Sequence, residues 1–156
     1  MSSNEKLIVL DDVCKHFKVS GGMLKAVDHI SLDIYKGETF GLVGESGSGK
    51  TTIGRAIIRI NPISAGEVTF KGQRISGKIN KETNREIVKK IQMIFQDPMA
   101  SLNERAKVDY IVSEGILNHH LYKDEQDRED KVQQALKEVG LLPEFASRFP
   151  HEFSGG

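Results

Sequence analysis

Hydrophobic and polar residues alternate along the first third of the chain, and this period of two predicts β-strands. One or two strands are expected from the apolar run 7–10 and the alternation that continues to Phe17. A further strand is expected over 30–34, after a glycine-containing loop at 18–24. The segment 39–44 is apolar at both alternating positions, which is typical of a strand buried on both faces.

After residue 50 the spacing of apolar residues becomes helical. One predicted helix face is formed by four residues: Ile53, Ala56, Ile57 and Ile60. Pro62 helps to end this helix. A hairpin around Lys71-Gly72, a helix over 81–90 and an apolar strand over 91–95 are expected next.

Helical spacing dominates after the first hundred residues. Helices are predicted around 108–112 and 132–139, and Gly140 suits the end of the second. We therefore predict an α/β fold in two parts. Residues 1–98 mix strands, hairpins and helices, and residues 99–156 form a helical subdomain attached to the sheet core.

The composition is that of one soluble globular domain of 156 residues, 38% hydrophobic and 28% charged. Its 22 basic residues balance its 22 acidic ones, which removes any overall attraction to nucleic acid or to an anionic membrane. Cys14 is the only cysteine and cannot form an internal disulfide, so a reducing compartment is expected. The apolar run near the start is too short for a signal sequence or a transmembrane helix, so any role at a membrane would require a partner.

The most specific stretch is GESGSGKTT at 44–52, which matches the phosphate-loop pattern G-x-x-x-x-G-K-[ST]. Gly44, Gly47 and Gly49 permit backbone angles that place several N–H groups on one concave surface. The N-terminus of the following helix favours an anion. Lys50 supplies a positive charge for the outer phosphates of a nucleotide, and the threonine after it offers a hydroxyl to Mg²⁺.

A glycine-rich turn with an incidental lysine is the alternative to a phosphate loop. The flanks argue against it, because a buried strand is predicted before the loop and an amphipathic helix after it. The motif alone does not name the reaction, since kinases, GTPases, helicases and transport ATPases share it.

Two further motifs narrow the choice among phosphate-loop proteins. QMIFQDP (92–98) follows a predicted strand, and FSGG (153–156) follows the helical part. The order of phosphate loop, glutamine loop, helical part and Ser-Gly-Gly resembles that of the ATP-binding cassette (ABC) ATPases. The third motif of that family is Leu-Ser-Gly-Gly-Gln, whereas this chain has Phe153 in place of the leucine and ends before the glutamine.

Within this family the chain looks closest to the ATPases of oligopeptide and dipeptide importers. The resemblance lies in three segments: AVDHISLDIYKGETFGLVGESGSGKTT (26–52), SAGEVTF (64–70) and QMIFQDPMASLNER (92–105). Glu104 is one departure, because proline would be expected after Asn103. The resemblance covers nearly the whole chain and implies part of an ABC-type P-loop NTPase core, with an N-terminal antiparallel β-subdomain and a helical subdomain.

The resemblance assigns roles to residues outside the phosphate loop. Gln96 would ligate Mg²⁺ and sense the γ-phosphate, and a simple polar loop residue is the alternative. Phe17 would stack on adenine, with a core position on an edge strand as the alternative and Tyr35 as a lower-ranked candidate. Ser154–Gly156 would close over ATP held by an opposite subunit, which implies a head-to-tail dimer.

The implied site has catalytic, metal-binding and nucleotide-binding residues. Catalytic roles fall to Lys50 and Gln96, and Mg²⁺ would be held by Thr51 and Gln96. Nucleotide binding would involve the following residues: Phe17, Gly44, Glu45, Ser46, Gly47, Ser48, Gly49, Lys50, Thr51, Thr52, Ser154, Gly155 and Gly156.

The resemblance implies an ATP-binding subunit that couples ATP hydrolysis to uptake of oligopeptides or dipeptides, with ATP and Mg²⁺ as cofactors. Its partners would be a second ABC ATPase subunit, identical or a sister, and transmembrane permease subunits. An extracytoplasmic peptide-binding protein would act indirectly, and no nucleic acid is expected. The protein would be peripheral, on the cytoplasmic face of the cell membrane. Two alternatives remain open: a soluble ABC ATPase without a permease, and a catalytically inactive nucleotide-binding or assembly module.

The family also has a second carboxylate motif, an apolar strand ending in Asp-Glu, which should follow the third motif. LIVLDD (7–12) has a similar pattern, but the order of motifs makes it an N-terminal strand. The resemblance implies that the sequence represents the front half of a nucleotide-binding domain. We expect weak nucleotide binding at best and negligible hydrolysis. We also expect low stability unless the chain oligomerises, since strand 39–43 needs neighbours.

Two further features are expected to have no specific function. His119-His120 is predicted to be a solvated helix end rather than a metal site, because adjacent residues do not share a helix face. Cys14 is expected to be a passive strand residue.

Overall fold

The computed structural model describes residues 5–153, apart from the side chains of Pro98 and Met99. The chain divides into two compact units, one extending to Met93 and the other beginning at Ile94. The domain division after residue 98 that the sequence suggests stays a prediction.

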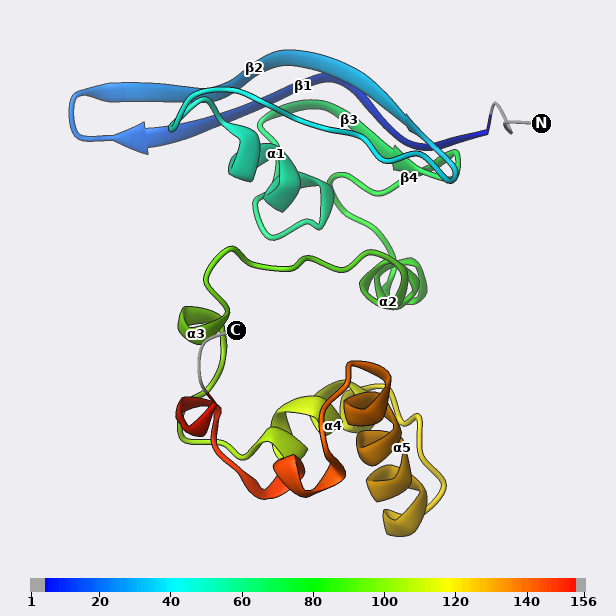
Figure 1. Ribbon diagram of the computed structural model, residues 1–156. Coiled ribbons are helices and arrows are strands. Elements are labelled where there is room, and N and C mark those ends of the chain that lie inside the picture. The colour runs from blue at the N-terminus through cyan, green and yellow to red at the C-terminus, as the bar shows by residue number, and fades with distance from the viewer. Residues whose placement is uncertain (1–4, 154–156) are drawn as a thin grey trace. The chain divides into compact units, whose positions relative to one another are not determined.

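A four-stranded antiparallel sheet dominates the first unit (Figure 1). Its strands are β1 (Lys6–Val19), β2 (Gly22–Tyr35), β3 (Ala65–Phe70) and β4 (Gln73–Arg74), in the order β2-β1-β3-β4. The apolar run and the alternation after it belong to one long strand, β1, which forms a hairpin with β2. The predicted antiparallel β-subdomain is therefore confirmed, and so is the β3–β4 hairpin around Lys71-Gly72.

The β1–β2 hairpin is irregular near its middle. The register of β1 shifts against both β2 and β3 around residues 11–14. Asp12 and His29 lie at this irregularity with φ values of +49° and +53°, which non-glycine residues seldom adopt. Gly66 of β3, at φ +85°, packs directly against the Asp12 carbonyl. The irregularity bends the hairpin and turns side chains that plain alternation would separate toward one another.

One hydrophobic core underlies the sheet. It is built from these buried residues: Leu10, Val13, Val27, Ile53, Val68, Ile75 and Ile87. Helices α1 (Lys50–Ile57) and α2 (Lys81–Lys90) supply Ile53 and Ile87. At the start of α2 the Asn80 side chain accepts a hydrogen bond from the Thr83 N–H, so this helix begins where a capping residue occurs in the sequence.

Helix α1 is shorter than the apolar spacing predicts. It ends at Ile57, and Arg59 adopts a left-handed φ of +65° before Pro62 is reached. Ile60 is consequently 55% exposed rather than on the buried face. The prediction for this end of the helix is wrong because backbone reversal at Arg59 overrides the apolar pattern.

Two predicted strands are absent from residues 5–153. Neither 39–44 nor 91–95 forms a strand or pairs with the described sheet. Val43 is 92% exposed and Ile94 is 96% exposed, contrary to the burial that their apolar character predicts. These predictions are wrong for this chain because a strand exists only where another strand satisfies its backbone groups.

The second unit is helical. It contains α3 (Pro98–Ser101), α4 (Val108–Asn118), α5 (Glu125–Glu138) and the 3₁₀ turns η1 (Pro143–Ser147) and η2 (Pro150–Glu152). The two helices predicted from apolar spacing are thus confirmed as α4 and α5. Gly140 follows α5 at φ +78°, and His119 and His120 lie at the end of α4, as predicted.

A buried arginine joins the two main helices of this unit. Arg128 of α5 has a side chain only 10% exposed and contacts Asp109 of α4 at 2.9 Å and Glu125 at 2.7 Å. Its guanidinium lowers the pKa of Glu125 by hydrogen bonding. Val132 and Leu136, four and eight residues after Arg128, are buried on the same face of α5.

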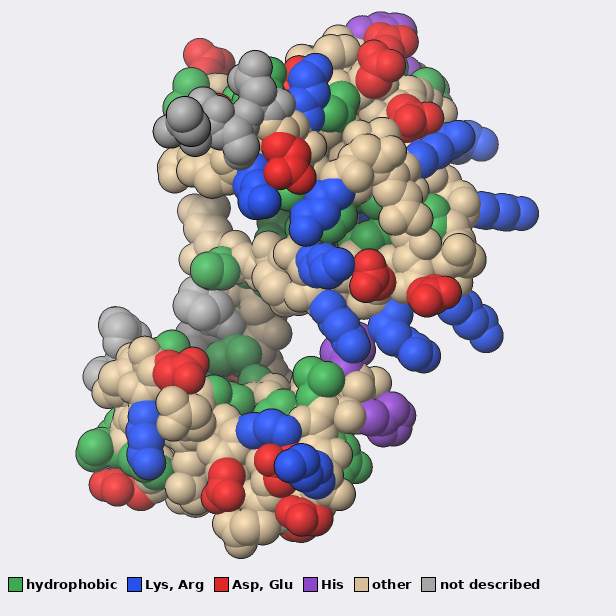
Figure 2. Space-filling view, turned by 90° about the vertical axis from the view of Figure 1, so that its right-hand side faces the viewer, with side chains coloured by type: hydrophobic (Ala, Val, Ile, Leu, Met, Phe, Trp, Pro, Cys, Tyr) green, Lys and Arg blue, Asp and Glu red, His purple; other side chains and the backbone are tan. Residues whose placement is uncertain are grey.

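Charge is unevenly distributed along the balanced sequence. Residues 71–90 carry seven lysines and arginines and two acidic residues, whereas residues 124–130 carry five acidic residues and one arginine. Figure 2 shows several lysine and arginine side chains reaching into solvent from the first unit. No helix within residues 5–153 is both long enough and apolar enough to cross a membrane.

Candidate phosphate-binding site

The segment 44–49 turns the chain into helix α1. Gly47 and Gly49 have φ values of +83° and +91°, in the left-handed region that glycine adopts without strain. Gly49 is the N-cap of α1, and Lys50 is the first residue of the helix. The loop therefore delivers the free N–H groups of α1 and the lysine side chain to the same place.

Close packing against β2 holds this loop in position. A Cβ atom placed on Gly49 would lie 2.2 Å from the carbonyl oxygen of Ala26, which no side chain can accommodate. At the other end of the loop, a Cβ on Gly44 would lie 2.7 Å from Ser48 Oγ. The glycines of the motif thus allow direct contact of the loop with the β1–β2 hairpin and with itself.

The ammonium group of Lys50 lies over the loop. It donates hydrogen bonds to the carbonyl oxygens of Gly44 and Glu45, both at 2.6 Å, and to Ser48 Oγ at 3.1 Å. These contacts keep the positive charge within the turn, beside the N-terminus of α1. The charge and the helix dipole act together on any anion that enters this site.

A pocket of about 230 Å³ adjoins the loop. It is lined by Phe17, Leu24, Ala26, Gly47, Ser48, Gly49, Lys50, Thr51 and Thr52. Phe17 is half-buried and pairs with Leu24 across the hairpin, so these two residues form an apolar wall. The Lys15 ammonium lies 4.7 Å from the centre of the Phe17 ring. The pocket therefore has an apolar side and a side formed by the loop backbone and the Lys50 side chain.

The structure brings together several residues that the sequence predicts for the site: Phe17, Gly47, Ser48, Gly49, Lys50, Thr51 and Thr52. Glu45 and Ser46 are exposed residues of the same loop and do not line the pocket. Tyr35 pairs with Lys6 at the opposite end of the hairpin from Phe17.

Two groups of predicted residues remain untested. Gln96 is exposed and belongs to the second unit, so its role beside Thr51 stays a prediction. Ser154, Gly155 and Gly156 lie outside the described residues.

Leu24 and Ala26 are pocket residues that the sequence analysis missed. Their place beside the loop follows from the register of β2 against β1, and residue patterns do not specify that register.

The acidic pair at the start of the chain lies apart from this pocket. Asp12 accepts a hydrogen bond from the His29 ring at 2.7 Å and raises the pKa of that histidine. Asp11 and Asp12 are exposed, and neither lines the pocket. This agrees with their interpretation as residues of an N-terminal strand.

Comparison with known proteins connects these features to one family. The family model described as ABC transporter matches residues 27–156. An oligopeptide transport ATP-binding protein, AmiF of Streptococcus pneumoniae, is 57% identical over 153 residues, which are 98% of this chain and 50% of that protein. The corresponding protein OppF of Bacillus subtilis is 50% identical over 152 residues, covering 97% of this chain and 50% of that protein. The chain therefore spans about half the length of these curated relatives.

The fold agrees with this relationship. The ATP-binding cassette MJ0796, in a dimeric post-hydrolysis state bound to ADP and Pi, superimposes with a TM-score of 0.78 at 21% identity. That match covers 95% of this chain and 63% of the other. The protein cbiO1 from Clostridium perfringens, part of the ABC transporter complex cbiONQ, gives a TM-score of 0.71 at 24% identity, covering 97% of this chain and 57% of the other. With a matching family model over residues 27–156, this chain belongs to the ABC transporter family.

Proposed function

We propose that this chain binds Mg-ATP in the pocket beside the phosphate loop and provides the nucleotide-binding part of an oligopeptide importer's ATPase subunit. One observation carries the proposal. The Lys50 ammonium, the N-terminus of α1 and the Phe17 ring all border the same pocket. A nucleotide has an anionic end and an aromatic end, and the pocket offers a matching group to each.

Different residues of the pocket would bind different parts of Mg-ATP. Loop amides and Lys50 hold the β- and γ-phosphates and orient them for in-line attack by water. Thr51 is exposed in the first turn of α1 and lines the pocket, so its hydroxyl is available as an oxygen ligand. Oxygen is the donor that Mg²⁺ prefers, and we propose Gln96 as a second oxygen donor. When bound, the metal would neutralise negative charge on the phosphates.

Transport of oligopeptides is proposed from the names of the relatives, which are oligopeptide transport ATP-binding proteins at 57% and 50% identity. On this proposal the partners are a second ATPase subunit and permease subunits, and the location is the cytoplasmic face of a membrane. We propose that hydrolysis belongs to the whole ATPase. Turnover by this chain alone is expected to be negligible, because no acidic side chain lines the pocket among residues 5–153.

Replacing Lys50 with alanine is expected to weaken ATP binding at least tenfold, because one charge-assisted contact to the phosphates is lost. The measurement is calorimetric titration of the chain with ATP and Mg²⁺, accompanied by hydrogen exchange of segment 44–52. The matched control is Lys81→Ala, since Lys81 is also the first residue of a helix, α2. The proposal fails if wild-type protein shows neither heat nor protection, or if Lys50→Ala and Lys81→Ala bind ATP equally.

Phe17 is expected to act on the base and not on the phosphates. Phe17→Ala should weaken ATP binding by about 1–3 kcal/mol, the typical range for a lost aromatic stacking contact on a base. Binding of inorganic tripolyphosphate, which has no base, should be unchanged. The control is Phe40→Ala, because Phe40 is 41% exposed and does not line the pocket. Equal losses for the two ligands would assign Phe17 a structural role only.

A further inference from the structure

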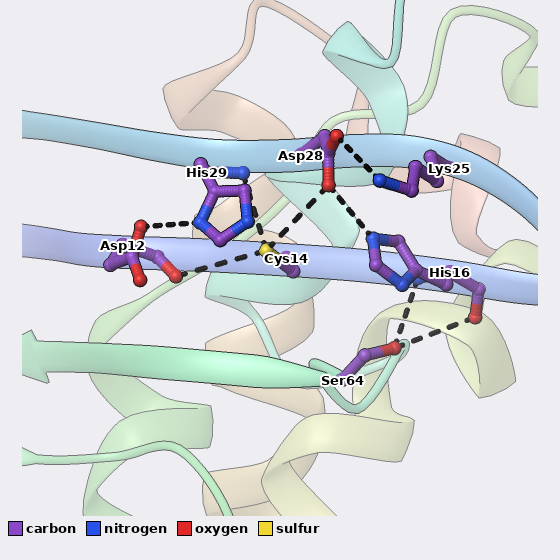
Figure 3. A network of polar contacts seen from close by, with 7 residues as sticks. All are labelled: Asp12, Cys14, His16, Lys25, Asp28, His29 and Ser64. Atoms are coloured by element: carbon purple, nitrogen blue, oxygen red, sulfur yellow. Dashed lines mark hydrogen bonds and ion pairs between the residues drawn. The ribbon is translucent and has the colours of Figure 1, made fainter.

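Three side chains of the β1–β2 hairpin converge at its irregular middle (Figure 3). Cys14 and His16 come from β1, and Asp28 comes from β2. The Cys14 Sγ, His16 Nε2 and Asp28 Oδ1 atoms all lie within 4.8 Å of one another. Cys14 and Asp28 lie in the irregular stretch of the hairpin, where neither has a partner in the β1–β2 register, and His16 follows this stretch on β1.

The spacing of these atoms is close to that around a tetrahedral zinc ion. Metal–ligand bonds of about 2.0–2.3 Å place neighbouring ligand atoms about 3.3–3.6 Å apart in a tetrahedron. Asp28 Oδ1 is 3.1 Å from His16 Nε2 and 4.0 Å from Cys14 Sγ. The ligand atoms of Cys14 and His16 lie within 4.8 Å of each other, so this pair must close by up to about 1 Å for the three atoms to share one ion.

Each of the three residues has a supporting contact from a neighbour. The His29 N–H donates to Cys14 Sγ at 3.2 Å. Lys25 donates to the outer carboxylate oxygen of Asp28, Oδ2, at 3.2 Å, which leaves Oδ1 directed toward the cluster. Ser64 Oγ accepts the His16 backbone N–H at 2.9 Å. Supporting contacts of this kind orient the ligands of metal sites.

Burial and charge suit a metal that binds sulfur and nitrogen. Cys14 is 2% exposed, whereas the side chains of His16 and Asp28 are 23% and 38% exposed, so an ion can enter from the His16–Asp28 side. A Cys14 thiolate and the Asp28 carboxylate carry two negative charges against one positive charge on Lys25. Thiolate and imidazole together favour Zn²⁺ over Mg²⁺ or Ca²⁺.

We propose that Cys14, His16 and Asp28 form a zinc-binding site that joins strands β1 and β2. Binding releases the proton of the Cys14 thiol, and the fourth position of the ion is open to water. The same hairpin presents Phe17 and Ala26 to the nucleotide pocket. The metal would hold β1 and β2 together close to the residues that form the apolar wall of that pocket.

The site is tested by titrating the chain with Co²⁺ as a spectroscopic substitute, without nucleotide, and then displacing it with Zn²⁺. One equivalent should produce a thiolate-to-cobalt charge-transfer band, and Zn²⁺ should remove it. Cys14→Ser should abolish the band, and both His16→Asn and Asp28→Asn should weaken metal binding at least tenfold. His29→Asn is the matched control and should retain binding, because it removes an imidazole of the same hairpin while keeping the backbone N–H that contacts Cys14.

A second variant separates a metal site from an ordinary hydrogen-bond network. Lys25→Gln removes the ammonium that holds Asp28 Oδ2 and should weaken zinc binding, whereas a network with no metal role would show no zinc affinity in either protein. Circular dichroism checks that each variant is folded. If Cys14→Ser does not fold, the zinc affinity of Asp28→Asn tests the proposal in its place. Absence of the charge-transfer band in wild-type protein, or equal zinc affinity in wild type and Asp28→Asn, would overturn the proposal.

Discussion

Gly49→Ala is expected to remove most ATP binding and to lower the melting temperature of the chain. The added Cβ would lie 2.2 Å from the Ala26 carbonyl oxygen, and residue 49 holds a φ of +91° that alanine adopts only with strain. Such strain alone costs about 1–3 kcal/mol. Relief of the clash requires the loop to move off β2, and the Lys50 ammonium and the N-terminus of α1 would move with it. Calorimetric titration with Mg-ATP should show an affinity loss of at least tenfold.

Gly47→Ala is the control for this prediction. Gly47 lies in the same loop at a similar φ of +83°, but a Cβ there would meet no atom within 4 Å. It therefore experiences backbone strain without the steric contact. Equal losses for Gly47→Ala and Gly49→Ala would show that the contact with Ala26 does not matter for nucleotide binding.

The second large effect is expected from Gly66→Ala, which should destabilise the sheet of the first unit. A Cβ on Gly66 would lie 2.3 Å from the Asp12 carbonyl oxygen and 2.6 Å from that of Asp11, at a φ of +85°. Strain of about 1–3 kcal/mol adds to a clash that only separation of β3 from β1 can relieve. Urea denaturation followed by far-ultraviolet circular dichroism should show a clearly lower midpoint.

Gly72→Ala provides the comparison for the sheet. Gly72 lies in the β3–β4 turn at φ +75°, and a Cβ there would meet no atom within 4 Å. The difference between the two midpoints therefore measures the close approach of β3 to the irregular part of β1. A midpoint for Gly66→Ala equal to that for Gly72→Ala would contradict this account.

Both glycines contact the same hairpin, and this explains why the hairpin is central to the protein. The carbonyl oxygen of Ala26 on β2 contacts Gly49 of the phosphate loop, and the carbonyl oxygen of Asp12 on β1 contacts Gly66 of β3. Phe17 faces the pocket from the same hairpin. Changes at either glycine are thus expected to affect the proposed nucleotide pocket through backbone contacts rather than through side-chain charge.

Local residue signals were sufficient for several elements. Helix α2 has the bounds predicted from the sequence, 81–90, and the side chain of Asn80 before it accepts a backbone N–H of the first turn. Gly140 follows α5 in the left-handed conformation that its position predicts. The β3–β4 hairpin turns at Lys71-Gly72. In each case the interactions that decide the structure join residues close in sequence, so residue order alone identifies them.

The two failed strands show the opposite case. Segments 39–44 and 91–95 have the apolar composition of buried strands, yet Val43 and Ile94 are almost fully exposed. Apolar character indicates that a segment would be stable when covered, but it does not supply the neighbouring strand. Strand formation depends on hydrogen bonds to distant residues, and the described sheet pairs neither segment.

The sequence by itself determined the phosphate loop, since its glycines, Lys50 and Thr51 lie within one short segment, 44–51, and act locally. Only the tertiary structure decided that Phe17 and Leu24 form the wall of the same pocket, and that Asp28 meets Cys14 and His16. Those contacts depend on the register between β1 and β2 and on its irregularity near Asp12. Register is set by the packing of a whole hairpin, so a one-residue slip would separate these side chains without changing any local signal.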